Sequence, residues 1–423
     1  MKFSAPRGTK DILPEEAAKW HWLESTFREQ CRLYGFGEIR TPIFEETELF
    51  LRSIGEETEV VNKQMYTFTD RGDRSLTLRP EGTAGVVRAY LQNGLAEQGG
   101  VQRLFYIGPF FRYERPQAGR FRQFHQAGIE LFGSDDSQAD VEVISLAVYF
   151  LESLGLEGAK LRINSMGCKE CRAAYREALR KALAPVVDKL CDWCKERYAG
   201  NTLRILDEKR PECRQYFKDL PSIQDYLDEN CKAHFAKVLA GLDLLKIQYE
   251  VDPGIVRGLD YYTRTVFEFN QPGIGAQDAL GGGGRYDGLV EEFGGKPTPA
   301  VGFGLGLERV LAAVGEKAPL PAHEKALVYV AFAVEARAKL ATTLLAELRA
   351  ASIAAISDLL GRSLKAQMKE AARLNCRFVI LIGEDELAAD SVTLRDMVSG
   401  EQQCVKRGEV VAKLKQLLEQ EQS

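Results

Sequence analysis

The sequence of 423 residues lacks any long hydrophobic run. Its longest wholly apolar stretch, Ala326–Val334, is far shorter than the roughly 18 residues that a membrane span needs. The N-terminal residues carry charges and a proline where a secretory signal requires an apolar segment. We therefore expect no transmembrane helix, no membrane partner and a cytoplasmic location.

The sequence also lacks a large excess of either charge. Lys and Arg number 56 against 61 Asp and Glu, for a net charge of -5. A nucleic-acid partner would therefore have to be held by local basic patches rather than by overall basicity. Hydrophobic residues at 45% and charged residues at 28% are typical of a globular chain, and the length predicts two or three domains.

Several common nucleotide-binding and metal-binding patterns are missing as well. There is no Walker A sequence and no protein-kinase signature. Gly302, Gly304 and Gly306 follow one another at alternate positions, which is not the dinucleotide-binding fingerprint. The four histidines are too scattered to predict a metal site, and we expect His125 to pack beside a pocket rather than to act in catalysis.

The pattern of the first part of the chain predicts helices and an antiparallel sheet. Apolar residues recur at helical spacing over Glu15–Leu33, and an extended stretch containing Pro42 follows. Strands are predicted at Gln102–Arg112 and Gln123–Phe132, which flank a polar loop as in a hairpin. The predicted class is α+β, with an antiparallel sheet flanked by helices.

The rest of the chain changes character twice. A charged, cysteine-containing segment at 167–242, with helical periodicity over Ile223–Leu245, predicts a helical insertion between two parts of one core, 1–166 and 243–318. After a proline-containing linker, strand and helix patterns alternate over 325–423. That alternation predicts a separate α/β domain of about 100 residues.

The predicted hairpin carries the first group of candidate site residues. Arg112 stands at the end of one strand, and Gln126, Gly128 and Glu130 lie two apart on the other, so their side chains share one face. An arginine beside a carboxylate on a sheet face suits a ligand that carries both phosphate and amine. A hairpin with a solvated basic loop explains the same residues equally well.

Three further stretches present candidate ligand-binding residues. Glu81 and Thr83 follow a strand and could accept hydrogen bonds from an ammonium group, although a helix N-cap formed by Thr83 is the simpler explanation of that turn. Arg285 and Tyr286 directly follow a run of four glycines, which would display them at a site that a ligand approaches closely. Arg309 lies near the start of a predicted helix, where the helix dipole disfavours a cation and an anionic ligand would explain it.

Taken in order, these stretches resemble the histidyl-tRNA synthetases of the bacterial type, which are class II aminoacyl-tRNA synthetases. Phe111, Arg112 and the strand that ends at Gly133 resemble motif 2, and Gly302–Arg309 resembles motif 3. The segments at 257–263, Arg-Gly-Leu-Asp-Tyr-Tyr-Thr, and 283–289, Gly-Gly-Arg-Tyr-Asp-Gly-Leu, resemble the two histidine-specific signatures. The resemblance extends over nearly the whole chain.

The resemblance implies a ligase of protein biosynthesis that activates L-histidine with ATP, accompanied by Mg²⁺, and transfers it to tRNA(His). It assigns Arg112 to the α-phosphate, Arg309 to the γ-phosphate, and Arg257 to the charge that develops on the α-phosphate. The residues that it assigns to histidine are Glu81, Thr83 and Gln126 for the α-amino group, Glu130 and Tyr262 for the imidazole, and Tyr261 and Tyr286 for the pocket walls. It also implies a homodimer through the N-terminal helix and the Pro42 strand.

Elementary chemistry agrees with these implied roles. The attacking carboxylate is already a nucleophile, so adenylate formation requires positioning and positive charge more than a general base. An imidazole has two ring nitrogens, which a carboxylate and a hydroxyl can both satisfy. For tRNA, the loop that carries Arg115, Gln117 and Arg120 is the candidate acceptor-end patch, and the domain at 325–423 reads the anticodon by resemblance.

Nine cysteines in a chain without an export signal indicate reduced thiols or metal ligation rather than disulfides. Cys168 and Cys171 are separated from Cys191 and Cys194 by 19 residues, a spacing typical of a zinc site. Such a site is not general in the family, and a cytosolic chain also keeps buried thiols. The sequence therefore leaves open whether these four cysteines bind a zinc ion or are buried, reduced thiols.

Two other functions fit parts of the same pattern. A regulatory subunit of ATP phosphoribosyltransferase resembles the catalytic core but does not aminoacylate, and it typically lacks the anticodon domain and departs from the Arg257 signature. Here Arg112, Arg257, Arg309 and the C-terminal domain are all present. A synthetase-like module within a kinase is excluded because the chain has no kinase signature.

Overall fold

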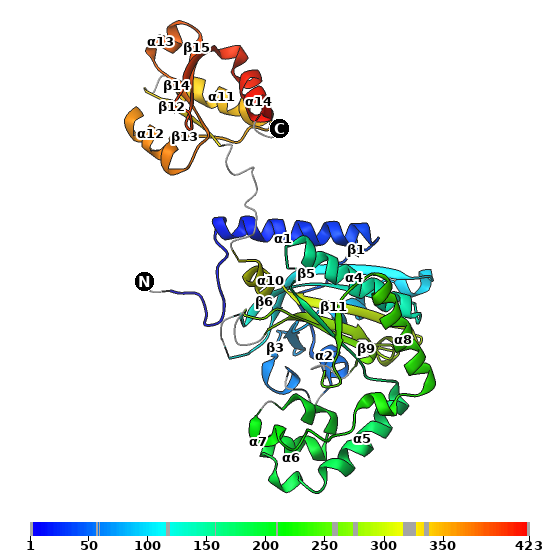
Figure 1. The fold of residues 1–423 in the computed structure, drawn as a ribbon. Coiled ribbons are helices and arrows are strands. Elements are labelled where there is room, and N and C mark those ends of the chain that lie inside the picture. The colour runs from blue at the N-terminus through cyan, green and yellow to red at the C-terminus, as the bar shows by residue number, and fades with distance from the viewer. Residues whose placement is uncertain are drawn as a thin grey trace. The chain divides into compact units, whose positions relative to one another are not determined.

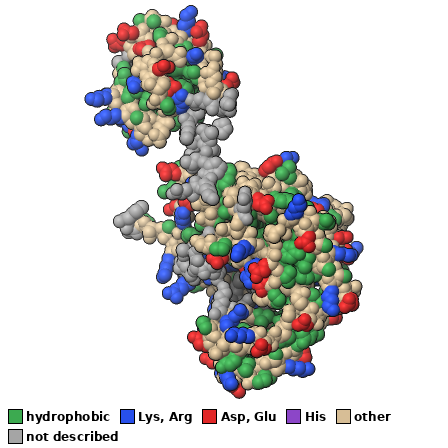
Figure 2. Space-filling model, in the orientation of Figure 1, with side chains coloured by type: hydrophobic (Ala, Val, Ile, Leu, Met, Phe, Trp, Pro, Cys, Tyr) green, Lys and Arg blue, Asp and Glu red, His purple; other side chains and the backbone are tan. Residues whose placement is uncertain are grey.

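The computed structural model describes residues 3–55, 58, 60–115, 119–156, 158–208, 210–255, 261–273, 278–315, 327–333 and 338–420. The chain forms two compact units, Met1–Pro319 and Leu320–Ser423. On the face drawn in Figure 2, acidic and basic side chains are interspersed over the described surface of each unit. Among the described residues, none of the helices has both the length and the apolar character needed to cross a bilayer.

The first unit is organised around an eight-stranded sheet (Figure 1). Its strands, in spatial order, are β1 (Gly37–Glu38), β5 (Gln102–Phe111), β6 (Gln123–Phe132), β11 (Ala300–Gly306), β10 (Ala279–Arg285), β9 (Thr263–Asn270), β7 (Lys160–Ser165) and β8 (Tyr249–Val251). The six central strands are antiparallel, and only the two short edge strands pair in parallel. The predicted antiparallel sheet is thus confirmed, as is the hairpin formed by β5 and β6.

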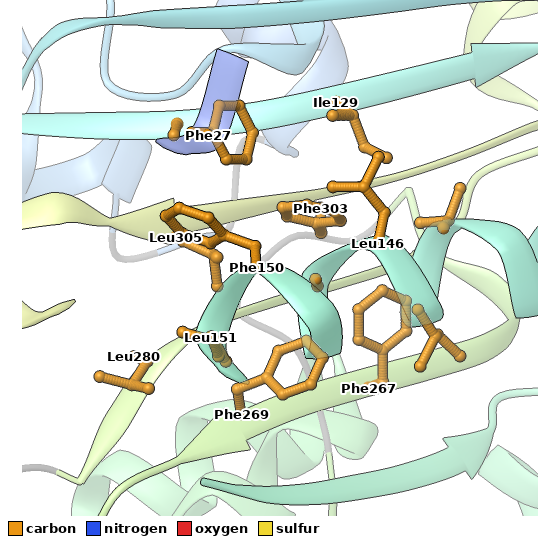
Figure 3. Packing of buried hydrophobic residues seen from close by; sticks show 14 of the residues in the cluster. Phe27, Ile129, Leu146, Phe150, Leu151, Phe267, Phe269, Leu280, Phe303 and Leu305 are labelled. Atoms are coloured by element: carbon orange, nitrogen blue, oxygen red, sulfur yellow. The ribbon is translucent and has the colours of Figure 1, made fainter. Parts of the chain in front are cut away.

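Helices pack on both faces of this sheet. The α-helices of the first unit outside the insertion are α1 (Pro14–Leu33), α2 (Thr47–Ile54), α3 (Thr83–Gln92), α4 (Ser137–Ser153), α9 (Leu289–Glu292) and α10 (Leu307–Val314). Helix α1 contacts α4 and α10, and α4 contacts β6 and β11. Figure 3 shows the core that they enclose, in which Phe27, Phe150 and Phe303 interlock through edge-to-face ring contacts.

Local sequence explains where these helices begin and end. Helix α1 starts at Pro14. Proline is well suited to the first helical position, because the N–H group that it lacks would have no hydrogen-bond partner within the helix there. Helix α4 starts after Asp136, whose carboxylate accepts a hydrogen bond from the Gln138 N–H at 2.8 Å. Pro42 lies in an irregular segment between β1 and β2 (Phe44–Glu46), each of which is an edge strand of its sheet, as expected for a residue that cannot donate to a sheet ladder.

A three-stranded sheet and the insertion complete the first unit. The small sheet has the order β2, β4 (Ser75–Leu78), β3 (Tyr66–Thr69). The insertion contains α5 (Lys169–Leu183), α6 (Asp192–Ala199), α7 (Pro211–Arg214) and α8 (Glu229–Leu244), with 3₁₀ turns at Val187–Lys189, Thr202–Asp207 and Ile223–Tyr226. The single helix expected over Ile223–Leu245 is wrong, because the Asp228 carboxylate accepts from the Cys231 N–H at 2.7 Å and starts α8 there.

The second unit is an α/β domain, as predicted from the alternating pattern. Its sheet has the order β13 (Ala355–Ser357), β12 (Val328–Phe332), β14 (Phe378–Ile382), β15 (Ser391–Asp396), β16 (Gln402–Lys406). Its helices are α11 (Ala338–Ala350), α12 (Leu364–Arg373), α13 (Glu384–Ala388) and α14 (Val410–Gln420). Buried residues of α11 and α14 pack on one face of the sheet, and α12 packs on the other.

Candidate active site

The floor of the candidate site is the face of the large sheet that lies opposite helices α1 and α4. Along β6, Gln126, Gly128 and Glu130 lie at alternate positions and pair with Gly306, Gly304 and Gly302 of β11. The prediction that the three β6 side chains share one face is therefore confirmed by the register. Since most of the paired residues are glycines, the floor has few side chains and leaves room above the sheet.

Two of these glycines differ in the space that surrounds them. A Cβ atom at Gly302 would lie 2.0 Å from the Glu130 Oε2 atom, so only glycine permits the carboxylate to lie there. A Cβ atom at Gly304 would make ordinary van der Waals contacts, the nearest to the Tyr106 hydroxyl at 3.7 Å, and Gly304 lines both cavities described below. Glycine at 302 is therefore required by a protein side chain, whereas a side chain at 304 would reduce the space over the floor.

A small cavity of about 70 Å³ lies over this floor. Six of the residues predicted to bind histidine line it, together with Arg112, Tyr106 and several glycines. The six are Glu81, Thr83, Gln126, Tyr261, Tyr262 and Tyr286. The structure thus brings together side chains from strand β6, the start of α3, and the segments before β9 and after β10, which are far apart in the sequence.

Glu130 lies behind the wall of this cavity rather than on its surface. Its Oε1 atom accepts a hydrogen bond from the Thr83 hydroxyl at 2.7 Å, and its Oε2 atom accepts one from the Tyr286 hydroxyl. Burial raises the pKa of Glu130 to about 8, and the charge of Glu81 adds to that rise, while the two hydroxyl donors oppose it. Glu130 is therefore a buried carboxyl group that is readily protonated near neutral pH.

The Glu81 carboxylate, not the Thr83 hydroxyl, caps helix α3. Its two oxygens accept hydrogen bonds from the N–H groups of Thr83 at 2.7 Å and Ala84 at 2.8 Å. The N-cap expected from Thr83 is wrong, since that hydroxyl donates to Glu130 instead. Burial raises the pKa of Glu81, and its hydrogen bonds from Ala84 and Thr83 act in the opposite direction. Each oxygen keeps a further lone pair with which it could accept a hydrogen bond from a ligand.

A second cavity of about 230 Å³ adjoins the first. The two cavities share Arg112, Gln126 and Gly304 in their walls. Arg309 lines the larger cavity from the first turn of α10, and Arg120 lines it from the loop between β5 and β6. Among the described residues, the larger cavity is thus lined by three arginines and two glutamates, whereas the smaller one is lined by four tyrosines and the single carboxylate of Glu81.

Hydrogen bonds hold both predicted phosphate-binding arginines at this cavity. The Arg112 Nε atom donates to the Pro80 carbonyl at 2.8 Å, and its guanidinium lies 5.4 Å from the centre of the Phe124 ring. The Arg309 Nη1 atom donates to the Ala279 carbonyl at 2.6 Å. Burial and the nearby Arg120 and Arg112 charges lower the pKa of Arg309. An anion bound between these cations would relieve their repulsion.

Some predicted residues lie elsewhere or outside the described part of the chain. Arg257 and Gln117 belong to segments that are not described. Arg115 is exposed, whereas Arg120 forms an ion pair with Glu114 at 3.3 Å. The expectation that Arg285 is displayed at the site is wrong, because its fully buried guanidinium donates from Nη2 to Asp140 Oδ2 at 2.5 Å.

The structure also adds residues that the sequence patterns did not single out. Tyr106 on β5 lines the small cavity, and its ring would collide with a Cβ atom at either Gly82 or Gly128. The two glycines are the sequence feature that could have indicated a bulky neighbour at this position. Nothing in the sequence links them to Tyr106, however. Glu308 is the partner of His125, with 3.0 Å between Oε1 and Nδ1, in the wall of a neighbouring cavity.

The cysteines predicted as one possible metal site belong to two separate groups. Cys168 and Cys171 gather with Asp228 and Cys231, whereas Cys191 and Cys194 gather with Glu208 and Cys213. The two Cys-x-x-Cys pairs, considered above as one candidate zinc site, therefore do not lie together. The ligands that complete each group are more than ten residues distant in the sequence, where no fixed spacing marks them.

The fold is that of a class II aminoacyl-tRNA synthetase. It has an antiparallel sheet, with motif 2 on β5 and β6 and motif 3 on β11 and α10, and a separate α/β unit. The family described as histidyl-tRNA synthetase matches residues 8–310, and the anticodon binding domain matches residues 320–417. The chain belongs to the histidyl-tRNA synthetase family.

Individual relatives agree with this family. A histidine–tRNA ligase of Desulforudis audaxviator is 54% identical over 418 residues, which cover 98% of this chain and 99% of the relative. The crystal structure of apo Staphylococcus aureus histidyl-tRNA synthetase superposes with a TM-score of 0.83 at 39% identity, covering 98% of this chain and 100% of that one. The fold is shared by a Bacillus halodurans structure described as an ATP phosphoribosyltransferase regulatory subunit/histidyl-tRNA synthetase. That structure is 23% identical and has a TM-score of 0.67, covering 90% of this chain and 99% of that one.

Proposed function

We propose that this chain ligates L-histidine to tRNA(His) through a histidyl-adenylate, releasing diphosphate and then AMP. The observation that carries this proposal is the pair of adjoining cavities, which share Arg112, Gln126 and Gly304. A carboxylate held in the smaller cavity would face an α-phosphate held at Arg112, at the junction of the two. Such positioning supplies most of what this displacement requires.

The smaller cavity suits histidine. Glu81, Thr83 and Gln126 offer acceptors for its α-ammonium group, and Tyr261 and Tyr286 form walls around its ring. Glu130 and Tyr262 would bind the two imidazole nitrogens. For Glu130 this requires the hydroxyl of Thr83 or Tyr286, which now donates to its carboxylate, to turn away when the ring enters.

The larger cavity suits the ATP phosphates. Arg112 would stabilise the α-phosphate and Arg309 the γ-phosphate, while Arg257, by resemblance, would stabilise the charge that develops during the displacement. Glu114 and Glu308 are acidic side chains on the cavity walls. These two carboxylates, together with phosphate oxygens, form the oxygen-rich ligand set that Mg²⁺ prefers, and they would hold the ion that neutralises phosphate charge.

The remaining parts of the proposal concern tRNA and assembly. Arg115, Gln117 and Arg120 would contact the acceptor end, and the domain at 325–423 would bind the anticodon. The catalytic core would comprise 1–166 and 243–318, with the insertion at 167–242. A cytoplasmic homodimer formed through the N-terminal helix and the segment around Pro42 completes the proposal.

The regulatory-subunit function is less well supported than the ligase. The Bacillus halodurans structure shares 23% identity with this chain, whereas the Desulforudis audaxviator histidine–tRNA ligase shares 54%. A regulatory subunit would bind histidine without attaching it to tRNA.

The test is attachment of labelled histidine to tRNA in the presence of ATP and Mg²⁺. We expect labelled, base-sensitive histidyl ester on tRNA(His) and none on other tRNAs. Folded protein that binds histidine yet forms no ester would contradict the proposal and favour the regulatory subunit. Arg112→Gln should strongly reduce this attachment. Arg103→Gln is its matched control and should not, because Arg103 lies near the start of β5, whereas Arg112 directly follows the other end, and because Arg103 pairs with Glu142.

A further inference from the structure

The insertion has little hydrophobic core of its own. Its apolar side chains form two small buried clusters, one around Tyr175 and Leu179 and the other around Leu183 and Ile205. Cysteines are part of both clusters. Small units with so little buried apolar surface usually need an additional cross-link, such as a disulfide or a structural metal.

The first cysteine group consists of Cys168, Cys171, Asp228 and Cys231. The Cys168 and Cys171 Sγ atoms are 3.4 Å apart, and they lie 3.1 and 3.4 Å from the Asp228 Oδ2 atom. Cys168 directly precedes α5, and Asp228 directly precedes α8. The first cysteine group therefore joins the start of the insertion, before α5, to the start of its last helix, α8.

The second cysteine group consists of Cys191, Cys194, Glu208 and Cys213. The Glu208 Oε2 atom lies 3.2 Å from the Cys191 Sγ atom and 3.5 Å from the Cys194 Sγ atom. Its members come from α6, α7 and the turn between them. This group has the same composition as the first, three thiols and one carboxylate, although it is formed by different elements.

The dimensions of both groups fit one tetrahedral ion. With Zn–S distances of about 2.3 Å, the sulfur atoms of a tetrahedral site are about 3.8 Å apart. In each group the four ligand atoms all lie within 4.8 Å of one another. A polynuclear iron–sulfur cluster would hold its ligand atoms farther apart than this, because several metal atoms and sulfides must lie between them.

Backbone N–H groups point at the sulfur atoms. The Asp228 N–H donates to the Cys171 Sγ atom at 3.2 Å, and the Cys191 N–H donates to the Cys213 Sγ atom at 3.4 Å. The Arg210 Nη2 atom also donates to the Cys191 Sγ atom, at 2.8 Å. Because thiols are weak acceptors, donors gathered around the sulfurs are typical of metal-bound thiolates, whose charge they offset.

We propose that the insertion binds two structural Zn²⁺ ions, each held by three cysteine thiolates and one carboxylate, at the first and second cysteine groups. All four positions of each tetrahedron are filled by the protein, which is the arrangement of a structural rather than a catalytic zinc site. Each ion cross-links elements that enclose one of the small clusters. These sites do not depend on the proposed function.

The first site lies next to the candidate active site. Helix α5, which begins after Cys168, carries Arg172, whose Nη1 atom donates to the carbonyl of Tyr262 at 3.0 Å. The Gly167 carbonyl accepts from the Arg264 N–H at 2.9 Å. Loss of the first ion would therefore loosen the segment that positions Tyr262, whereas loss of the second would loosen the insertion alone.

The test is the zinc content of the full-length chain, purified under reducing conditions with any affinity tag removed. We expect about two zinc ions per chain by elemental mass spectrometry, and about one in each of Cys171→Ser and Cys194→Ser. Cys404→Ser is the matched control, because Cys404 is exposed and belongs to neither group, and it should keep both ions. Folded, reduced wild-type protein that takes up no zinc when supplied with it, or that contains a disulfide by intact mass, would overturn the proposal.

A second pair of variants keeps the proposal testable if the serine variants do not fold. Asp228→Cys and Glu208→Cys each give one site four thiolates, which bind zinc more tightly than three thiolates and a carboxylate. Each variant should keep two ions and release one of them to a competing chelator at least about tenfold more slowly than wild type. Release at the wild-type rate would show that the carboxylates are not ligands.

Discussion

Replacing Glu130 with glutamine should change how the stability of the first unit depends on pH. In the folded chain the pKa of Glu130 is about 8, raised by burial from an ordinary value of 4.5. The contribution of this carboxyl group to the free energy of unfolding is therefore fully present below about pH 4.5. It is lost as the pH rises toward 8, because unfolding lets the carboxyl group ionise in water. Glutamine has the same shape, cannot ionise, and can still hydrogen bond to the hydroxyls of Thr83 and Tyr286.

The expected size follows from these pKa values. Each pH unit between the unfolded and folded pKa values changes the free energy of unfolding by about 1.4 kcal/mol. Between pH 6 and pH 8 the wild type should lose about 2 kcal/mol through this group, since ionisation in the folded state is already under way at pH 8. The stability of Glu130→Gln relative to wild type should rise by that amount over the same range.

Urea unfolding followed by tryptophan fluorescence measures this difference. All three tryptophans, Trp20, Trp22 and Trp193, belong to the first unit, so the signal does not report on the second. Glu97→Gln, at an exposed glutamate of the same unit, is the matched control and should track wild type. A stability difference between Glu130→Gln and wild type that stays constant from pH 6 to pH 8 would show that Glu130 does not ionise in this way.

Three further changes test other parts of the structure. Arg112→Gln and Arg309→Gln should each lower kcat/KM for adenylate formation by about 100-fold to 1,000-fold, because each removes a cation that faces phosphate charge, whereas Arg103→Gln should keep the wild-type rate in the same assay. Gly302→Ala should weaken histidine binding, measured by calorimetry, and lower the free energy of unfolding by about 1–3 kcal/mol, since its Cβ atom would lie 2.0 Å from the Glu130 carboxylate. Gly408→Ala is the control and should have neither effect, because its added Cβ atom would meet no neighbouring residue within 4 Å. Asp140→Asn should destabilise the first unit by up to about 3–5 kcal/mol in urea, because it removes the buried carboxylate charge closest to the Arg285 guanidinium and leaves that cation paired with Asp287 at 3.2 Å. Glu48→Gln, in an exposed ion pair with Arg52, should cost under about 0.5 kcal/mol, and equal effects of the two changes would contradict this.

The parts of the fold that local pattern determines were predictable from the sequence. Strand β6 runs over the predicted residues, and the alternation of Gln126, Gly128 and Glu130 placed them on one face because strand periodicity is two. In the second unit, the alternation of strand and helix patterns over 325–423 indicated the domain class. These features depend on residues close together in the chain.

The misplaced residues depend on contacts between distant segments. Arg285 and Tyr286 are neighbours in the sequence, yet only Tyr286 lines the small cavity. The Arg285 guanidinium is buried because it pairs with Asp140 and donates to the carbonyls of Ser134 and Asp136, all far away in the chain, in addition to its pair with the nearby Asp287. The grouping of the cysteines likewise depends on Asp228 and Glu208, since carboxylates in a charged segment give no local sign of metal binding. Glu81 capped α3 instead of Thr83 because the Thr83 hydroxyl is held by Glu130 across the site.

We propose that the two adjoining cavities together activate histidine with ATP. Amino-acid-dependent exchange of labelled pyrophosphate into ATP tests it most directly, with each standard amino acid supplied in turn to the wild-type chain. Exchange should occur with histidine alone, because only an imidazole satisfies both Glu130 and Tyr262. Folded protein that binds histidine but supports no exchange, or that exchanges equally well with another amino acid, would contradict the account.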